Sequence, residues 1–235
     1  DRSPSRGLGD VYKRQGLSNA RNKGILESRY EYILFCDDDN WLNEKYVWNC
    51  FEFLSKNPAF GIVGGHGVPV FEVNPPNWFE NFSSIYALGC RNDGEVTNVY
   101  GAGMFLRKSV LKGFVSKLSD RTGKSLISGG DSEICFHFLN NGYKIRQLCD
   151  NKFSHFIPKE RFDINYLYRM ASGRGKSFAQ LRVERNNGKR FKGVKYRFKI
   201  DFFNLFNMIK KRDRIQLMYF TKDRIAYWKY ILFNV

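Results

Sequence analysis

The order of apolar and polar positions predicts alternating strands and helices over the first two-thirds of the chain. Residues 30–36, Tyr-Glu-Tyr-Ile-Leu-Phe-Cys, form a mostly apolar run that is typical of a buried parallel strand. Residues 43–57 place apolar side chains every three or four positions, which predicts a helix. Residues 60–65 then predict a second short strand.

The same alternation continues towards residue 160. Ser18 is of the residue type that commonly caps a helix N-terminus. We expect further elements at residues 20–28 (helix), 96–106 (extended), 132–140 (helix) and 143–148 (closing strand). Strands that alternate with helices indicate an α/β domain, which we place at residues 16–160.

The last third of the chain differs in charge. Residues 157–235 contain 20 Lys and Arg against 6 Asp and Glu, a balance of +14, whereas the preceding residues contain 19 against 17, a balance of +2. Residues 161–235 interleave these cations with aromatic residues and predict a basic, mainly helical region, broken near residues 172–175. Such segments suit anionic membrane surfaces. A solvated helical face and an RNA-binding patch are the alternatives, although no known RNA-binding motif is present.

Composition and missing motifs exclude several classes of protein. The five cysteines are scattered singly, and an odd count without CxxC spacing argues against a disulfide framework and structural zinc and favours a reducing, cytoplasmic location. No apolar run approaches the roughly 20 residues of a spanning helix. The phosphate-loop, dinucleotide, zinc-protease and serine-hydrolase motifs are also absent.

Residues 1–15, DRSPSRGLGDVYKRQ, are polar and without periodicity. They resemble translated adapter sequence, and a natural disordered N-terminus is the alternative. We therefore interpret them as a leader outside the folded domain.

Three successive carboxylates, Asp37, Asp38 and Asp39, follow the strand predicted at residues 30–36. They repel one another unless a cation lies between them. Alternate residues share a side, so Asp37 and Asp39 could both face one Mg²⁺ or Mn²⁺, ions that prefer oxygen ligands. A solvated acidic turn that caps the next helix is the other interpretation.

Two further sites carry candidate chemistry. Asp131 begins the helix predicted after Gly129-Gly130, where it could cap the helix or act as a general base. Glu133 could orient the same loop or face solvent. His155 ends an extended stretch and could have a structural role or approach a metal or phosphate.

Several of these segments, in order, resemble family 2 glycosyltransferases of the GT-A fold. The matching segments are residues 16–24 (GLSNARNKG), 32–39 (YILFCDDD), 101–111 (GAGMFLRKSVL), 129–134 (GGDSEI) and 155–158 (HFIP) with the downstream Arg161. Several motifs in family order over about 145 residues are far more specific than any one of them.

The resemblance implies a role for each candidate residue. Asp37 and Asp39 would be the DxD motif that holds a divalent cation on the donor diphosphate. Asp131 would deprotonate the acceptor hydroxyl, beside residues 101–104. The donor-binding residues would be Arg21 and Asn22 in a loop on the nucleotide side, together with Asp37, Asp38 and His155.

The resemblance also implies a function. We expect an inverting transfer of sugar from a UDP- or GDP-type nucleotide donor to a glycan or lipid-linked acceptor, in surface polysaccharide synthesis at the cytoplasmic face of the plasma membrane. The alternative is a non-catalytic basic protein that binds RNA or an anionic membrane and has a structural acidic turn. The family normally begins with a strand, a helix and a second strand before the segment at residues 16–24, so we expect a partial GT-A fold without its first βαβ unit.

Overall fold

The computed structural model describes residues 16–90, 92–116, 118 and 126–233. The leader expected at residues 1–15 lies outside these residues. The chain divides into two compact units. Of the described residues, one unit comprises those within 18–116 and 130–162, and the other comprises 16–17, 118, 126–129 and 163–233.

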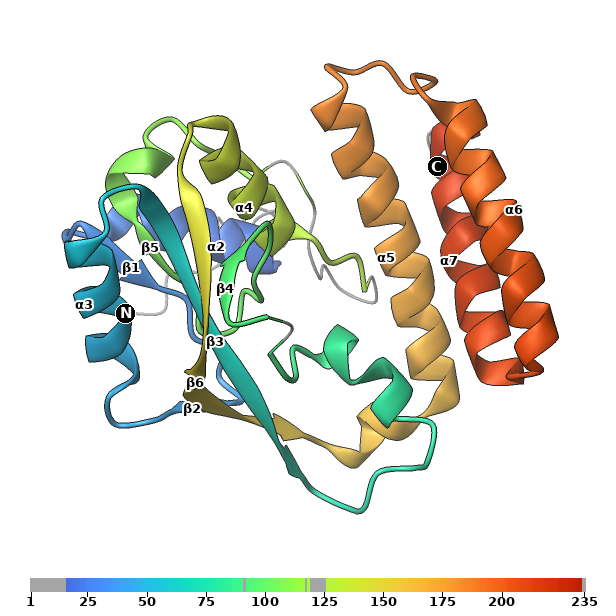
Figure 1. Ribbon diagram of the computed structural model, residues 1–235, viewed down its shortest axis with the longest axis horizontal. Coiled ribbons are helices and arrows are strands. Elements are labelled where there is room, and N and C mark those ends of the chain that lie inside the picture. The colour runs from blue at the N-terminus through green and yellow to red at the C-terminus, as the bar shows by residue number, and fades with distance from the viewer. Residues whose placement is uncertain (1–15, 91, 117, 119–125, 234–235) are drawn as a thin grey trace, which may run out of the picture. The chain divides into compact units, whose positions relative to one another are not determined.

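The first unit is built on one mixed sheet (Figure 1). Its strands are β1 (Tyr32–Leu34), β2 (Asn40–Leu42), β3 (Phe60–Phe71), β4 (Gly94–Val96), β5 (Phe105–Arg107) and β6 (Lys144–Ile157). They lie in the order β1-β5-β3-β6-β2, and β4 also pairs with β6. The long strands β3 and β6 run parallel at the centre, and the other pairings are antiparallel.

Helices cover both faces of this sheet. Successive residues of a strand point to opposite sides, so neighbouring residues contact different helices. Ile62 and Leu106 pack with side chains of α2 (Leu17–Glu27) and α4 (Gly130–Asn140). Their chain neighbours Val63 and Phe105 pack with Tyr46, Cys50 and Leu54 of α3 (Tyr46–Lys56) on the other face. Short 3-10 helices lie at Glu80–Tyr86, Lys108–Leu111 and Lys159–Phe162.

Several sequence-based boundaries need correction. The strand expected at residues 30–36 is limited to β1, and it pairs antiparallel with β5 rather than in a parallel ladder. A strand that the sequence did not indicate, β2, precedes α3, so the helix begins at Tyr46 rather than Asn43. The extended region at residues 96–106 is two strands, β4 and β5, separated by a turn. The short strands β1, β2 and β4 are extended because they pair with β5 or β6. The pattern of apolar residues within a short strand does not indicate which strand it pairs with.

The second unit is helical. Its helices are α5 (Ile164–Arg185), α6 (Val194–Lys211) and α7 (Arg214–Phe233). Asp163 caps α5, since its side chain accepts a hydrogen bond from the backbone N–H of Asn165. Ala179 of α5 is buried with Tyr227 and Ile231 of α7. Within the described residues, no helix combines the length and the apolar character needed to cross a membrane.

The break expected at residues 172–175 is wrong, because α5 runs through it without interruption. Gly173 lies against the main chain of Leu126, and Gly175 lies against the main chain of Asp223 in α7. A side chain at either position would collide with that backbone. These glycines therefore allow close packing of α5, which outweighs their low helix propensity.

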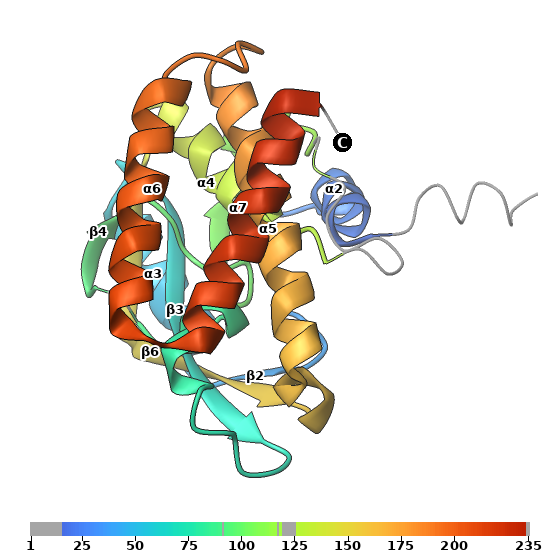
Figure 2. The ribbon, with the colours of Figure 1, turned by 90° about the vertical axis from the view of Figure 1, so that its right-hand side faces the viewer.

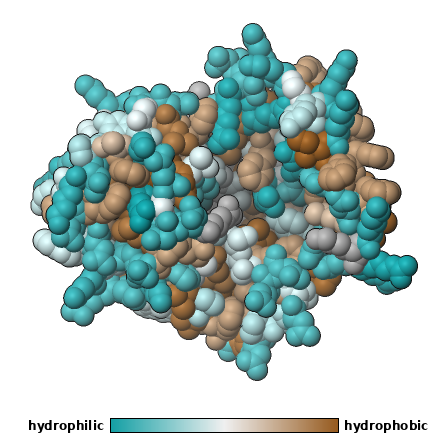
Figure 3. Space-filling model, in the orientation of Figure 1, coloured by the Kyte–Doolittle hydropathy of each residue, from teal (hydrophilic) through white to brown (hydrophobic). Residues whose placement is uncertain are grey.

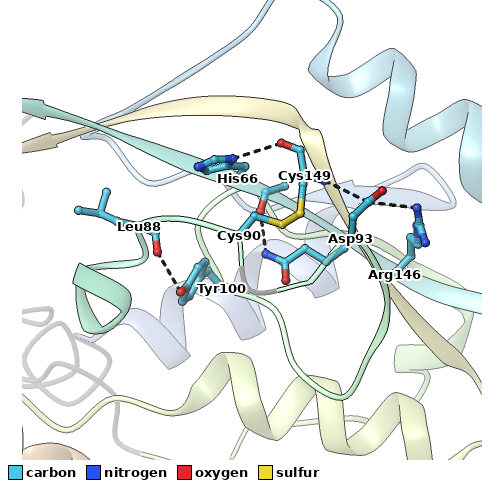
Figure 4. Close-up of a disulfide and its surroundings, with 9 residues drawn as sticks. His66, Leu88, Cys90, Asp93, Tyr100, Arg146 and Cys149 are labelled. Carbon is cyan, nitrogen blue, oxygen red and sulfur yellow. Dashed lines mark hydrogen bonds and ion pairs between the residues drawn. A yellow bond between two sulfur atoms is a disulfide. The ribbon is translucent and has the colours of Figure 1, made fainter. Parts of the chain in front are cut away.

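The cysteine prediction also needs correction, because Cys90 and Cys149 form a disulfide across 59 residues of sequence (Figure 4). Cys149 belongs to β6, near the register shift opposite Gly64 and His66, and its carbonyl oxygen lies 3.2 Å from Nδ1 of His66. Sequence spacing could not indicate this pairing, which depends on the fold. The cysteines therefore no longer favour a reducing compartment.

Candidate functional site

The ladder between β2 and β6 brings Asp39 and His155 together, although 116 residues separate them in the sequence. Asn40 pairs with His155 in this antiparallel ladder, and the N–H of Phe156 donates to the carbonyl oxygen of Asp39. Nε2 of His155 consequently lies 3.4 Å from Oδ2 of Asp39. Arg161, from the 3-10 helix after β6, donates to the same oxygen at 3.0 Å.

Several polar atoms at this junction are buried without a partner. Oδ1 of Asp39, Nδ1 of His155 and both amide atoms of the Asn40 side chain have no hydrogen-bond partner among the described residues. Burying an unpaired polar group is costly, so such atoms gathered in one place call for an explanation. Asn40 and His155 share a face because they lie directly opposite each other. The arrangement is that of a site built to receive a polar ligand.

Electrostatics at the Asp triplet favour a cation. The hydrogen bond with His155 is the largest influence on Asp39 and lowers the pKa of its carboxyl group, and the charge of Arg161 acts in the same direction. Burial, followed by the negative charges of Asp37 and Asp39, raises the pKa of the neighbouring Cys36. Asp39 is therefore a carboxylate at neutral pH, in a region of negative potential.

The donor set fits an ion that is shared with a phosphate ligand. Among the described residues, no group of three or more His, Cys, Asp or Glu side chains is arranged to hold a metal alone. Asp37 is half-buried and lies two residues before Asp39. Oδ1 of Asp39 has no hydrogen-bond partner among the described residues. Mg²⁺ and Mn²⁺ commonly take one or two carboxylates and complete their coordination with phosphate oxygens and water. Asp37 and Asp39 could hold such an ion together with a diphosphate.

Asp131 lies against the glycine turn of residues 101–104. Its Oδ2 accepts the N–H of Gly101 at 3.2 Å, and its Oδ1 accepts the N–H of Ser132 at 2.8 Å. An ionised carboxylate has about four acceptor positions, so these two bonds leave capacity for a hydroxyl. Asp131 is only half-buried, which leaves the carboxylate within reach of a ligand.

The glycine turn is itself fixed to the strand that leads to the Asp triplet. Gly103 donates its N–H to the carbonyl oxygen of Phe35, and the N–H of Phe35 donates to Met104. The hydroxyl of Tyr46, which is fully buried, donates to the carbonyl oxygen of Gly103 at 2.7 Å. Gly103 has φ +73°, in the left-handed region that favours glycine. A continuous set of hydrogen bonds thus runs from Asp131 through the turn to Phe35, two residues before Asp37.

The remaining predicted residues are placed as follows. Arg21 is on helix α2 rather than in a loop; it is buried, with its guanidinium 5.3 Å from the centroid of Phe35. Asn22 exchanges two hydrogen bonds with the backbone of Ser116, at 3.0 and 3.4 Å. Asp38 is exposed. The roles of these three in donor binding stay predictions.

Sequence reasoning missed Asn40, and it assigned no role to Arg161 or Tyr46. An asparagine after three aspartates is typical of a turn, and nothing in the neighbouring sequence indicates that the side chain of Asn40 is buried. From the sequence, Glu133 could either orient the loop or face solvent. In the structure it is buried and accepts a hydrogen bond from the hydroxyl of Ser116. It therefore orients the loop rather than facing solvent.

A family model covers part of this arrangement. The model of the family described as "Glycosyl transferase family 2" matches residues 12–114, which include the Asp triplet, Asn40 and the glycine turn. This segment is therefore similar to that family. Asp131, His155 and Arg161 lie beyond the matched segment but in the same compact unit.

Two curated glycosyltransferases resemble this chain in sequence. A glucosyl-dolichyl phosphate glucuronosyltransferase of Haloferax volcanii is 22% identical over 163 residues, which is 65% of this chain and 51% of that protein. A poly-β-1,6-N-acetyl-D-glucosamine synthase of Staphylococcus epidermidis is 33% identical over 57 residues, 24% of this chain and 14% of the synthase. The chain thus spans about half of the length of the first relative and less of the second.

A solved structure shares the fold. A mannosyltransferase from Pyrobaculum calidifontis, in complex with GDP-Man and Mn²⁺, superposes with a TM-score of 0.55 over 94% of this chain and 68% of that one, at 13% identity. At this identity the likeness concerns the fold alone. It confirms the α/β class and the GT-A-like architecture expected from the sequence, with a helical C-terminal part.

Proposed function

We propose that the chain is the catalytic part of an inverting glycosyltransferase that moves a sugar from a UDP- or GDP-type donor to a hydroxyl group of a glycan or lipid-linked acceptor. The observation that carries the proposal is the junction of Asp39, Asn40 and His155. Its buried unpaired atoms lie where β2 begins beside β6, directly after the Asp triplet. The related fold solved with GDP-Man and Mn²⁺ supports a nucleotide-sugar donor and a divalent ion.

On the donor side, the chain's own residues bind and orient the diphosphate. Asp37 and Asp39 would hold Mn²⁺ or Mg²⁺, which neutralises charge growing on the leaving diphosphate when it is bound. Arg161 and His155 fix Oδ2 of Asp39, so that Oδ1 keeps one direction. Orientation set before binding is what lets such groups act without reorganising during the reaction.

On the acceptor side, Asp131 accepts the proton of the attacking hydroxyl. The hydroxyl oxygen forms a bond to the anomeric carbon as the bond from that carbon to the diphosphate breaks, and the configuration inverts. The electron pair of the broken bond leaves with the diphosphate, and the proton passes to Asp131. The N–H of Gly101 holds Oδ2 of Asp131 during this step.

We infer where the reaction takes place from the relatives and from the charge of this chain. The two curated relatives are named for a dolichyl phosphate-linked substrate and for a polysaccharide. We place this chain in surface polysaccharide synthesis at the cytoplasmic face of the plasma membrane. The net charge of +16 suits a peripheral position on an anionic surface.

Thermal unfolding in the presence of nucleotides tests the proposal. UDP, GDP, ADP and CDP are each added at about 100 times their dissociation constant or at saturation, with Mn²⁺ or with EDTA. At that excess a specific ligand adds about 2.7 kcal/mol of stability, which corresponds to about 5–11 °C for a chain of this size. We expect such a shift with UDP or GDP in Mn²⁺ and no shift in EDTA. A cooperative melt that no nucleotide shifts would reject the proposal.

A further inference from the structure

Helix α6 turns its large apolar side chains to solvent. Six of them are at least half exposed: Tyr196, Phe198, Phe202, Phe203, Phe206 and Ile209. With 3.6 residues per turn, these positions fall on one half of the helix circumference, together with Lys195, Lys199 and Lys210. In Figure 3 apolar and hydrophilic side chains alternate along the right-hand edge, where Figure 1 draws α6.

The opposite face of α6 carries buried charge. Asp201 is 6% exposed and packs towards α7, which lies beside α6 in both views (Figures 1 and 2). Its carboxylate lies 2.9 Å from Nε of Arg197 and 3.4 Å from Nη1 of Arg224, and it accepts the indole N–H of Trp228 at 3.1 Å. An ordinary surface helix turns its apolar stripe towards the core, whereas α6 leaves these large aromatic side chains outside.

The ion pairs of Asp201 fix the rotation of α6. Turning the helix to bury its aromatic residues would take Asp201 away from Arg224 and Trp228 and leave Arg224 without this carboxylate. Removing one partner of a buried ion pair is strongly destabilising. The aromatic face is therefore held outward by the packing of the helical unit, and it needs a partner from outside the helix pair.

Charge indicates which partner fits. Residues 189–211 contain eight Lys and Arg, and Asp201 is their one acidic residue, a balance of +7. Nζ of Lys210 lies 4.4 Å from the ring centroid of Phe206. The cores of protein–protein interfaces are depleted in lysine. Helices that lie in a membrane interface combine aromatic residues with lysines whose stems run along the apolar surface and whose ammonium groups reach the headgroups.

We propose that α6 binds in the plane of an anionic lipid bilayer. Phe198, Phe202 and Phe206 enter the boundary between headgroups and acyl chains, while Lys195 and Lys199 bind lipid phosphates. The inference deepens the proposed function, because it names the surface through which the transferase reaches a membrane. Its test contains no nucleotide and no metal, so the two proposals can fail separately.

Flotation with lipid vesicles tests this assignment on the full chain. Binding is measured to phosphatidylcholine vesicles with and without 30 mol% phosphatidylglycerol, at 0.1 and 0.5 M NaCl. Two double variants change α6, Phe202→Gln with Phe206→Gln and Lys195→Glu with Lys199→Glu. Two matched controls change exposed residues of the other unit, Val47→Gln with Trp48→Gln and Lys112→Glu with Lys152→Glu.

We expect binding that requires the anionic lipid and weakens at high salt. The lysine variant should bind at least about 30-fold more weakly, since each lost cation contributes about 1 kcal/mol and the introduced glutamates repel the anionic lipid. The aromatic variant should bind at least about tenfold more weakly, and both controls should bind as the parent does. Failure of the parent to bind, or equal losses in the controls, would overturn the proposal. A dimer in sedimentation that the aromatic variant abolishes would assign the face to a second copy instead.

Discussion

Asp39 has two partners, His155 and Arg161, on one carboxylate oxygen and no partner among the described residues on the other. A carboxylate that only stabilised the fold would be expected to engage both oxygens, because a buried unpaired oxygen costs free energy. The division between Oδ2 and Oδ1 is what a metal ion bound at Oδ1 would need. In the proposed function, His155 and Arg161 position Asp39 for that ion.

Replacement of Asp131 by Asn separates catalysis from binding. Asparagine keeps the size of the side chain but cannot accept the proton, so we expect transfer to fall by about 10²–10⁴-fold while nucleotide binding in Mn²⁺ stays unchanged. The matched control is Asp150→Asn, at an exposed carboxylate. Release of nucleoside diphosphate from the sugar donor measures transfer. Full activity in the Asp131 variant would remove this residue from the mechanism.

The buried thiol of Cys50 makes stability depend on alkaline pH. Burial raises the pKa of Cys50 from 9.0 to about 12. The unfolded chain loses this proton above pH 9 while the folded protein keeps it, so stability is full below pH 9 and declines as the pH rises towards 12. The slope approaches about 1.4 kcal/mol per pH unit.

Urea unfolding from pH 8 to pH 11 measures this effect. The parent should lose stability faster than Cys50→Ala above pH 9, because the variant has no thiol to titrate at that position. Parallel curves for the two proteins would contradict the assignment.

At the scale of elements, local pattern predicted helices α2, α3 and α4 and the central strand β3, whose apolar positions recur with the right period. It did not predict β2, because three residues, Asn-Trp-Leu, carry no periodicity and are extended only through pairing with β6. The continuity of α5 was missed for a related reason. From the sequence alone, Gly173 and Gly175 predict an interruption of the helix, because their close contacts with the main chains of Leu126 and Asp223 are not known at that point.

A pair of identical substitutions tests that packing. Gly175→Ala adds a methyl group against the main chain of Asp223, so we expect a loss of about 1–3 kcal/mol in the free energy of unfolding. Gly24→Ala, inside α2, meets no atom within 4 Å and should be neutral or stabilise by up to about 1 kcal/mol. Chemical denaturation measures both. A stabilising Gly175→Ala would show that the close approach does not exist.

For the whole molecule, the order of motifs in the sequence indicated the α/β class and the resemblance to family 2 glycosyltransferases, whereas the roles of the site residues stay predictions. It could not supply the contact of Asp39 with His155, the partnerless amide of Asn40 or the disulfide between Cys90 and Cys149. Each of these joins segments that are brought together only by the pairing of β6 with its neighbours. The outward aromatic face of α6 was likewise hidden, since it follows from the ion pairs of Asp201.

The most direct test of the central claim is calorimetric titration of the preferred nucleoside diphosphate into the parent, Asp39→Asn and Asp150→Asn, with and without Mn²⁺. The two variants remove the same charge, from the Asp triplet and from an exposed position with no assigned role, and a cooperative melt of each confirms that it is folded. We predict that the parent binds only with Mn²⁺, that Asp39→Asn weakens binding by at least about 100-fold, and that Asp150→Asn changes it by less than about threefold. Binding that is independent of Mn²⁺, or equal effects of the two substitutions, would contradict a metal–diphosphate site at Asp39.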